Sequence, residues 1–262
     1  MTDAPLITEC HADGSARITL NRPGIHNAFD ERLIAELTAV LAALAGDDAV
    51  RVVVLTGSGK SFSAGADLNW MRRTSTYGEA ENLADARALA KLMATLNELP
   101  KPTLARVNGA ALGGGTGLVA CCDIVVASSQ AMFGTTEVRL GLIPAVIGPY
   151  VVAAIGVRQA RRLMLTGERI GAAEAVRIGL VHEVVAPDEL DAAIARLLDH
   201  LLKGGPHALA AAKRLVHDLA GRTIDADLID DTARRIAALR ASAEAREGLA
   251  AFLDKRQANW LP

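Results

Sequence analysis

Residues 50–56, with the sequence VRVVVLT, form a nearly continuous β-branched run that lacks the polar alternation of a half-exposed strand. Strands covered on both faces have this pattern, and they occur mainly in parallel sheets flanked by helices. Further strands are expected at 103–107 and 123–127, and amphipathic helices at 27–45 and 81–99. This alternation of strands and helices predicts an α/β fold whose strands pair mostly in parallel.

Other parts of the chain depart from this alternation. Residues 6–11 and 16–20 are expected to form two short strands around the turn at Asp13-Gly14. Residues 69–80 are polar and irregular, and we predict a mobile loop beside a site there. Beyond Phe133 the sequence predicts helices around one last strand at 181–185, and the helices lie at 151–155, 158–165, 172–178, 188–203, 206–220 and 227–255.

The last part of the chain is almost entirely helical. We predict a core over residues 1–200 and a helical region over residues 201–262. The apolar faces of this region have little β structure to pack against, so we expect them to form a subunit interface.

Three consecutive glycines, Gly113, Gly114 and Gly115, lie between the strand expected at 103–107 and an apolar run at 118–122. Glycine costs backbone entropy on folding but allows the backbone to approach another group closely. If a helix begins at these glycines, their N–H groups lie at the positive end of its dipole, where a developing negative charge is stabilised. On these residues alone, a flexible turn before a helix explains the glycines equally well.

The composition argues against several classes of protein. The 28 basic and 30 acidic residues give a net charge of −2, which implies no general attraction to nucleic acid or to an anionic membrane. Cys10, Cys121 and Cys122 offer no metal-binding spacing and no good disulfide pair. The N-terminal residues lack a targeting pattern, and no dinucleotide, phosphate-loop or metalloprotease motif occurs. We therefore expect a cytoplasmic protein with no metal and with neither a nucleic acid nor a membrane as partner.

Five segments occur in an order and spacing that resemble one known family. They are SFSAGADL at 61–68, VNGAALGGG at 107–115, CDIVVAS at 122–128, TEVRLGLIP at 136–144 and EGLAAFLDKRQANW at 247–260. Together they resemble the crotonase (enoyl-CoA hydratase/isomerase) superfamily from about residue 6 to the C-terminus. The resemblance implies a spiral of β-β-α turns, a C-terminal helical trimerisation region and a homotrimer or dimer of trimers. It also implies an acyl-CoA thioester substrate and no cofactor beyond the coenzyme A of that substrate.

The resemblance also assigns roles to particular residues. Ala66 and Gly114 match the positions whose backbone N–H groups hold the thioester oxygen as it gains enolate charge. The segment that receives the adenine matches Ala64, Gly65, Ala66, Asp67 and Leu68. The Asp67 carboxylate itself is expected to be structural rather than catalytic.

Further positions match residues that meet coenzyme A. Phe252 and Lys255 match tail residues that reach the coenzyme A of a neighbouring subunit. Arg22 and Lys60 lie where basic residues of the family meet its phosphates. A solvated surface charge is an equally good interpretation of these basic residues. His26 could line the same site, although an exposed histidine near a helix start is the simpler interpretation.

Hydratases of the family commonly use two glutamates, and this chain retains one of them. Glu137 matches the later glutamate, whereas Gly117 stands at the earlier position, three residues after Gly114. One glutamate can take a proton from water and deliver it to the adjacent carbon, and it can also move a proton between two carbons. A hydratase, an isomerase with the same base, and an acyl-CoA-binding protein without catalysis are therefore the three hypotheses.

A narrower likeness favours the hydratase. The segments LGLIPAVIGPYVVAAIG at 140–156, SAGADLNWM at 63–71 and ACCD at 120–123 resemble bacterial methylglutaconyl-CoA and isohexenylglutaconyl-CoA hydratases. In that subgroup a glycine also occupies the first glutamate position. Such substrates carry a second carboxylate, for which a cation near the acyl end is expected, and the residues available are Arg72, Arg73 and Arg139.

Overall fold

A computed structural model describes residues 4–261, and its larger sheet has six strands in the order β1-β2-β3-β5-β7-β10. The strands are β1 Leu6–Cys10, β2 Ser15–Leu20, β3 Val52–Gly57, β5 Thr103–Val107, β7 Ile124–Ser128 and β10 Glu183–Val185. Only the β1–β2 pair among these is antiparallel, and the other pairs are parallel. The predicted α/β fold with mostly parallel pairing is confirmed.

A smaller sheet has the order β4-β6-β8-β9. Its strands are β4 Ser61–Ser63, β6 Ala110–Leu112, β8 Met132–Gly134 and β9 Ile170–Gly171. Strands β4, β6 and β8 each follow directly on a strand of the larger sheet, namely β3, β5 and β7. A helix comes after each such pair, so the chain repeats a β-β-α turn and adds one strand to each sheet every time, which agrees with the predicted spiral.

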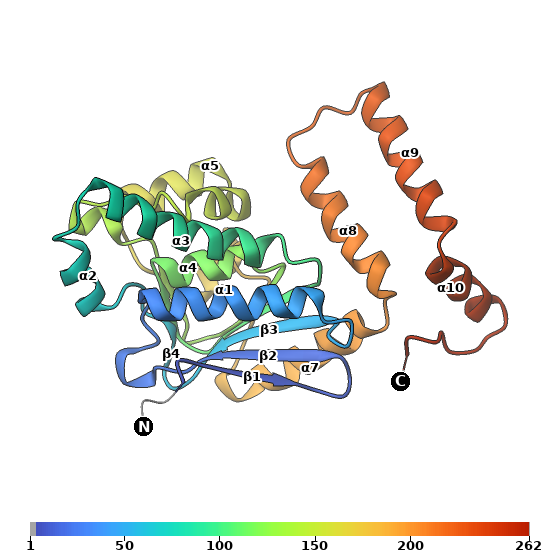
Figure 1. Cartoon of the computed structure of the whole chain (residues 1–262), viewed down its shortest axis with the longest axis horizontal. Helices are drawn as coiled ribbons and strands as arrows, with labels where there is room; N and C mark the ends of the chain where they lie inside the picture. Colours follow the sequence, from blue (N-terminus) through green and yellow to red (C-terminus); the bar gives the residue numbers. More distant parts are fainter. Residues whose placement is uncertain (1–3, 262) are drawn as a thin grey trace.

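Helices cover both faces of the larger sheet (Figure 1). On one face lie α1 Glu31–Gly46, α3 Glu79–Asn97 and α4 Gly114–Cys121, and on the other lies α7 Leu190–Leu202. Within β3, Val53 and Leu55 belong to the core beneath α1 and α3, whereas Val52 and Val54 pack with Leu190 of α7. Strand β3 is therefore buried on both faces, as its β-branched sequence predicts.

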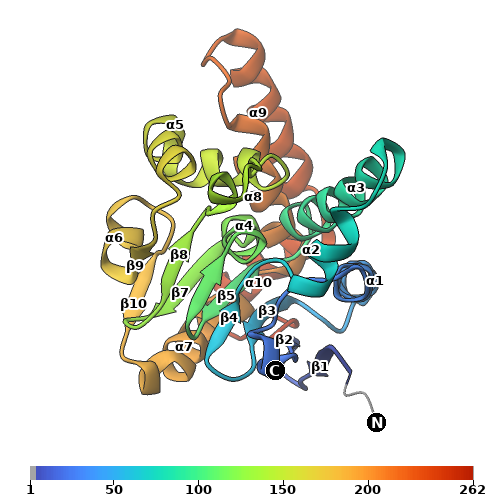
Figure 2. The same cartoon turned by 90° about the vertical axis from the view of Figure 1, so that its left-hand side faces the viewer.

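Helix α4 lies at the centre of the helical face. Figure 2 shows it between α3 and α5, which spans Gly148–Thr166. α6 spans Ala172–Arg177, and the short 3₁₀ helices are η1 Pro23–Ile25, η2 Glu137–Leu140 and η3 Pro187–Glu189. Both η1 and η2 lie next to the segments that the sequence analysis assigns to the site.

The prediction of a loop at 69–80 is wrong for its first half, because helix α2 spans Leu68–Thr74. The Asp67 carboxylate accepts hydrogen bonds from the N–H groups of Asn69 at 2.7 Å and Trp70 at 3.2 Å, and so caps this helix. The Trp70 ring is buried, and its Nε1–H donates to Asp85 of α3 at 3.1 Å. One cap and one buried aromatic therefore order a segment whose polar sequence lacks helical periodicity.

Two other helix boundaries differ from the prediction for the same reason. α1 begins at Glu31 rather than at residue 27, because the Asp30 carboxylate accepts from the Leu33 N–H at 2.8 Å. The single helix predicted at 227–255 is two helices, α9 Ala226–Arg240 and α10 Ala243–Leu253. The break falls where Ser242 Oγ accepts from the Ala245 N–H at 3.1 Å and starts a new helix.

The C-terminal helices leave the body of the molecule (Figure 1). After α7 come α8 Pro206–Leu219, α9 and α10, and α9 and α10 lie to the right of the sheets in Figure 1. Arg51 at the edge of β3 ties this region down, since its Nη atoms donate to the carbonyls of Trp260, Leu202 and Gly204 at 2.8, 2.8 and 2.6 Å. The predicted boundary between residues 200 and 201 falls inside α7, and the division into two regions stays a prediction.

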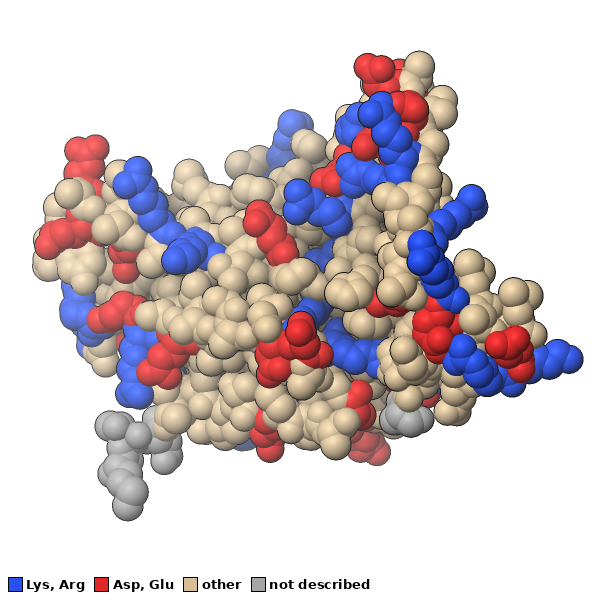
Figure 3. Space-filling model, turned by 45° about the vertical axis from the view of Figure 1, so that its right-hand side comes forward, with Lys and Arg blue, Asp and Glu red and all other residues tan. Residues whose placement is uncertain are grey.

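Acidic and basic side chains are interspersed over the face shown in Figure 3. In the projecting helices they form ion pairs with one another, such as Arg235 with Asp218 at 2.6 Å and Arg256 with Glu247 at 2.6 Å. Across residues 4–261, no helix has the length and apolar character that a membrane span requires.

Candidate active site

The backbone at Ala66 is held by a short parallel bridge to Phe29, between β4 and α2. The Phe29 N–H donates to the Gly65 carbonyl at 2.7 Å, and the Asp67 N–H donates to the Phe29 carbonyl at 2.7 Å. Successive peptide groups of an extended chain point in opposite directions, so the Ala66 N–H points away from Phe29. Within residues 4–261 this N–H has no backbone acceptor.

The second predicted amide lies at the start of α4, which begins at Gly114. Gly113 precedes it with a φ of +51°, and the Gly113 N–H donates to the Gly134 carbonyl of β8 at 2.8 Å. The first N–H of a helix has no acceptor within that helix, so the Gly114 N–H stands open at the positive end of the α4 dipole. The prediction that a helix begins at the glycines is confirmed.

The glycines that precede the two amides lie close to each other. A Cβ on Gly113 would lie 3.9 Å from the Gly65 Cα, and a Cβ on Gly65 would lie 3.8 Å from the Gly113 Cα. Ala66 and Gly114 are the next residues after this pair of neighbouring glycines. The same Cβ on Gly113 would lie 3.2 Å from Glu137 Oε1, so the Glu137 carboxylate stands beside them. A flexible turn would require none of these contacts.

The Glu137 side chain is half-buried, and one of its two carboxylate oxygens has no hydrogen-bond partner among the described residues. It opens η2, three residues after β8 ends at Gly134. Among the described residues, Glu137 Oε2 is buried and has no hydrogen-bond partner. Burial raises the pKa of Glu137 above its ordinary value of 4.5, and a hydrogen bond from its own backbone N–H offsets part of this rise. A half-buried carboxylate with a raised pKa is suited to accept and return a proton.

Side chains of Ile147 and Met93 pack against Gly117, which stands at the position of the missing glutamate. A Cβ on Gly117 would lie 2.2 Å from Ile147 Cγ2 and 3.3 Å from Met93 Cε. Ile147 immediately precedes α5, and both Ile147 and Met93 are buried. Ile147 therefore occupies the space that a glutamate at residue 117 would need, and that side of the site is apolar.

Several residues predicted to meet coenzyme A surround the Ala66 side of this site. Ala64 and Gly65 lead into Ala66, and the Ala64 N–H donates to the His26 carbonyl at 2.9 Å. The side chain of Leu68, at the start of α2, is exposed. Lys60 is exposed on the turn between β3 and β4.

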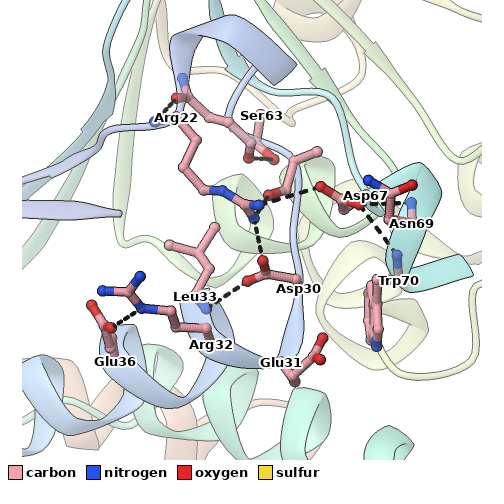
Figure 4. A network of polar contacts seen from close by, with 12 residues as sticks. Arg22, Asp30, Glu31, Arg32, Leu33, Glu36, Ser63, Asp67, Asn69 and Trp70 are labelled. Atoms are coloured by element: carbon pink, nitrogen blue, oxygen red, sulfur yellow. Dashed lines mark hydrogen bonds and ion pairs between the residues drawn. The ribbon is translucent and has the colours of Figure 1, made fainter. Parts of the chain in front are cut away.

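Arg22 lies among internal partners rather than in solvent (Figure 4). Its guanidinium is 2.8 Å from the Asp30 carboxylate and 3.3 Å from the Asp67 carboxylate. Asp67 has the structural role that the sequence analysis expects for its carboxylate, as a helix cap and an ion-pair partner. A contact of Arg22 with phosphate stays a prediction.

The predicted tail residues are not brought to this site within one chain. Phe252 belongs to α10 and Lys255 follows it, whereas α2 lies at the opposite end of the molecule in Figure 1. The Phe252 side chain is 82% exposed. Any contact of these residues with the site would have to come from another copy of the chain.

The three arginines considered for a second substrate carboxylate have different surroundings. Arg72 Nη1 donates to Asn69 Oδ1 at 3.0 Å, and Arg73 Nη2 pairs with the Glu31 carboxylate at 2.7 Å. Arg139 is exposed in η2, two residues after Glu137, and its Nε lies 3.2 Å from the place of a Cβ on Gly167. Arg139 is thus the nearest in sequence to the proposed base.

Sequence reasoning missed two residues of the site, Phe29 and Ile147. Phe29 appears in the sequence as a core position of a helix, yet its backbone holds the Ala66 segment, and its ring lies where a Cβ on Gly114 would sit, 2.4 Å away. The pair Asp30-Glu31 is a helix-start signal that could have placed residue 29 outside the helix. No local signal connects Ile147 with Gly117, because only packing brings them together.

The Ala66 and Gly114 N–H groups, which have no backbone acceptor among the described residues, follow two neighbouring glycines, and the Glu137 carboxylate lies close to one of these glycines; such an arrangement is suited to an enzyme that stabilises an oxyanion and moves protons. A model of the family described as enoyl-CoA hydratase/isomerase matches residues 11–261, and the chain belongs to that family. The crotonyl-CoA hydratase of Syntrophomonas wolfei is 36% identical over 248 residues, which are 94% of each chain. The 2,3-dehydroadipyl-CoA hydratase of Escherichia coli is 37% identical over 241 residues, covering 91% of this chain and 92% of that one.

Solved structures agree with these matches. The crystal structure of an enoyl-CoA hydratase from Shewanella pealeana superimposes with a TM-score of 0.95 at 44% identity, covering 99% of this chain and 97% of that chain. The comparisons confirm the crotonase resemblance, the predicted fold class and the prediction of an enzyme of the enoyl-CoA hydratase type. Members of this family use CoA thioesters as substrates. The likeness to methylglutaconyl-CoA hydratases stays a prediction.

Proposed function

We propose that this enzyme adds water across the 2,3 double bond of an enoyl-CoA thioester. The N–H groups of Ala66 and Gly114 hold the thioester oxygen while it gains enolate charge. Glu137 removes a proton from water as the water oxygen bonds to C3. It then returns that proton to C2 of the enolate, so the proton and the hydroxyl group both end on the product. This chemistry requires no cofactor beyond the coenzyme A that the substrate carries.

One observation carries this proposal. The half-buried Glu137 carboxylate, with its raised pKa, lies beside Gly113, which with its neighbour Gly65 precedes Gly114 and Ala66. Because Ile147 fills the space next to Gly117, Glu137 performs both proton transfers in turn. We expect the hydroxyl group and the proton to be added to the same face of the double bond, because one carboxylate acts on both the water and the adjacent carbon.

We further propose a branched or carboxylated acyl group, as in methylglutaconyl-CoA. The likeness of residues 140–156 to hydratases of such substrates supports this class. A second support is the Escherichia coli relative, whose name specifies the dicarboxylic 2,3-dehydroadipyl group. Arg139 is the cation we assign to the second carboxylate, because Arg73 is already paired with Glu31.

An isomerase that moves a double bond from the 3,4 to the 2,3 position is the second candidate. It is favoured by the single carboxylate, since one base is sufficient to move a proton between two carbons. Incubation with a 3-enoyl-CoA separates the two reactions. An isomerase yields the 2-enoyl ester, whereas a hydratase leaves the 3-enoyl ester unchanged.

The proposal is tested with a set of straight, branched and carboxylated 2-enoyl-CoA esters. Hydration is measured as the loss of absorbance of the conjugated thioester. Turnover is expected with these esters and is expected to be fastest with a carboxylated one. Tight binding of every ester without turnover would replace the enzyme assignment with that of an acyl-CoA-binding protein.

For the coenzyme A itself, we propose that the backbone of residues 64–68 receives the adenine and that Lys60 meets the phosphates. We also propose a homotrimer or a dimer of trimers in which Phe252 and Lys255 reach the site of a neighbouring subunit. Exposed apolar side chains on α9 and α10 support this assembly: Ile229, Ile236, Leu249, Phe252 and Leu253. Sedimentation equilibrium gives the mass that checks it.

The rate of hydration is expected to fall as the pH is lowered through the raised pKa of Glu137. The base must be deprotonated to accept a proton from water, and burial raises its pKa above 4.5. The acid limb of the kcat/KM profile should therefore give an apparent pKa above that of an ordinary glutamate side chain, which is about 4.3 in model peptides. A profile of kcat/KM against pH for crotonyl-CoA measures it. Constant kcat/KM down to pH 4.5 would contradict the raised pKa.

Introducing a glutamate at the missing position is expected to destabilise the fold. In Gly117→Glu the new Cβ would lie 2.2 Å from Ile147 Cγ2, and overpacking of a core costs about 1–3 kcal/mol or more. With Ile147→Ala added, the glutamate gains room, so the double variant should lose less stability than the sum of the two single variants. Urea unfolding of the four proteins measures this coupling, and simple additivity would show that Ile147 is not the obstacle.

A further inference from the structure

Arg22 is linked to two helix caps at once (Figure 4). Its Nη1 is 2.8 Å from Asp30 Oδ2, and its Nη2 is 3.3 Å from Asp67 Oδ2. Nη1 also donates to the Ala28 carbonyl at 2.8 Å. The exposed fractions of the three charged side chains are 21% for Arg22, 18% for Asp30 and 10% for Asp67, so solvent screens these ion pairs only in part.

Each carboxylate divides its two oxygens between different tasks. Oδ1 of Asp30 accepts from the Leu33 N–H at 2.8 Å and caps α1. Oδ1 of Asp67 accepts from the Asn69 N–H at 2.7 Å and caps α2. The remaining oxygen of each residue faces Arg22, so the guanidinium joins the N-termini of the two helices.

The two caps lie directly after the two residues of the backbone bridge. Asp30 follows Phe29, and Asp67 follows Ala66. The bridge itself consists of the Phe29 N–H to Gly65 carbonyl bond and the Asp67 N–H to Phe29 carbonyl bond, both of 2.7 Å. Arg22 therefore links the two residues that directly follow the bridge, Asp30 and Asp67. Any shift between α1 and α2 would be transmitted to the peptide group of Ala66.

We propose that Arg22 is a positioning residue that orients the Ala66 N–H toward the thioester oxygen. This inference rests on the proposed function, because it concerns the amide that stabilises the enolate. It differs from the phosphate contact expected from the resemblance, in which Arg22 would bind the coenzyme A part of the substrate. A donor displaced by about 1 Å can cost about 10²-fold in rate, so a distant contact of this kind can affect the chemical step.

The test compares Arg22→Gln with wild type on two thioesters, crotonyl-CoA and S-crotonyl-N-acetylcysteamine, which carries no phosphate. If Arg22 positions the amide, kcat should fall by about 10- to 100-fold for both esters with little change in KM. If Arg22 binds phosphate, KM should rise for crotonyl-CoA alone and the rate with the short ester should stay unchanged. The second result, or an unchanged kcat, would overturn the proposal.

A spectroscopic readout separates positioning from a general loss of structure. In wild type, the two N–H donors should lower the infrared C=O stretching frequency of a bound enoyl thioester, and Arg22→Gln should reverse part of this shift. Arg32→Gln is the matched control, since Arg32 lies on α1 and forms an exposed pair with Glu36 at 2.6 Å. It is expected to leave kcat and the C=O frequency at their wild-type values.

Should Arg22→Gln fail to fold, Asp67→Asn supplies the same test. The amide oxygen of asparagine can keep the cap on α2 while the charge facing Arg22 is removed. Its kcat is expected to fall with both esters, and a folded Asp67→Asn with wild-type kcat would refute the inference. If wild type itself turns over no enoyl thioester, the proposed function fails instead, and this outcome is distinct from an unaffected variant.

Discussion

Replacing Glu137 by Gln is expected to lower kcat for enoyl-CoA hydration by about 10²–10⁴-fold, the range for loss of a general acid–base group. The upper part of this range is expected because one carboxylate serves both the water and C2. Glutamine has nearly the same shape but accepts no proton, so binding of the thioester should survive. Steady-state kinetics and the dissociation constant of an acyl-CoA product, measured by calorimetry, check the two halves of this expectation.

The same substitution carries its own stability control. Burial raises the pKa of Glu137, so the folded protein binds this proton more tightly than the unfolded chain does. The stability contributed by that proton is present at low pH and is lost as the pH rises through the raised pKa. At neutral pH the Gln variant should therefore have a Tm no lower than that of wild type.

Glu36→Gln, an exposed change on α1, should leave kcat intact. A Glu137→Gln enzyme with wild-type turnover would remove Glu137 from the mechanism.

Replacing Gly114 by Ala is the second change with a large expected effect, a loss of about 10²–10³ in kcat, as for removal of one oxyanion donor. The new Cβ would lie 2.4 Å from Cε2 and 2.7 Å from Cδ2 of the Phe29 ring. Because the backbone of Phe29 also holds the Ala66 segment, the displacement should disturb both N–H donors together. Kinetics with crotonyl-CoA measure the loss, and the infrared C=O frequency of the bound thioester reports it directly.

Gly46→Ala provides the matched control for this change. A Cβ on Gly46, at the end of α1, would meet nothing within 4 Å, so turnover should stay at the wild-type value. Gly114→Ala is expected to lose activity at temperatures well below its own Tm, because the donor is displaced while the fold persists. Wild-type kcat in a folded Gly114→Ala protein would show that this amide does not hold the oxyanion.

Local sequence patterns predicted a large part of the fold. The β-branched run of β3 fits a strand buried on both faces, and the apolar spacing of α1 and α3 gives each helix one hydrophobic face, so these patterns determine their elements. The errors occur where a single side chain decides a boundary. Asp30, Asp67 and Ser242 each accept hydrogen bonds from the backbone N–H groups that begin a helix, and each sets a helix start that the hydrophobic periodicity does not predict.

The site could be predicted in part. The glycines and Glu137 stand in recognisable segments, because close backbone approach and proton transfer demand particular residue types. The role of Phe29 was not predictable from its neighbours, since its hydrophobic character fits a helix core equally well. The resemblance offered a phosphate contact for Arg22, with a solvated surface charge as an equal alternative, whereas the structure places its guanidinium between two helix caps.

The sequence by itself determined the α/β class with mostly parallel strands, because this depends on hydrophobic spacing that acts locally, whereas the β-β-α turns and the choice of Glu137 as the base were expected from the family resemblance. Only the tertiary structure decided that the glycines preceding Ala66 and Gly114 are neighbours, that Ile147 fills the space beside Gly117, and that Arg22 joins two helix caps. The physical reason is that these contacts are short-range in space and distant along the chain. Their geometry is determined by the packing of α1, α2 and α4 on the sheets, which no local pattern of residues encodes.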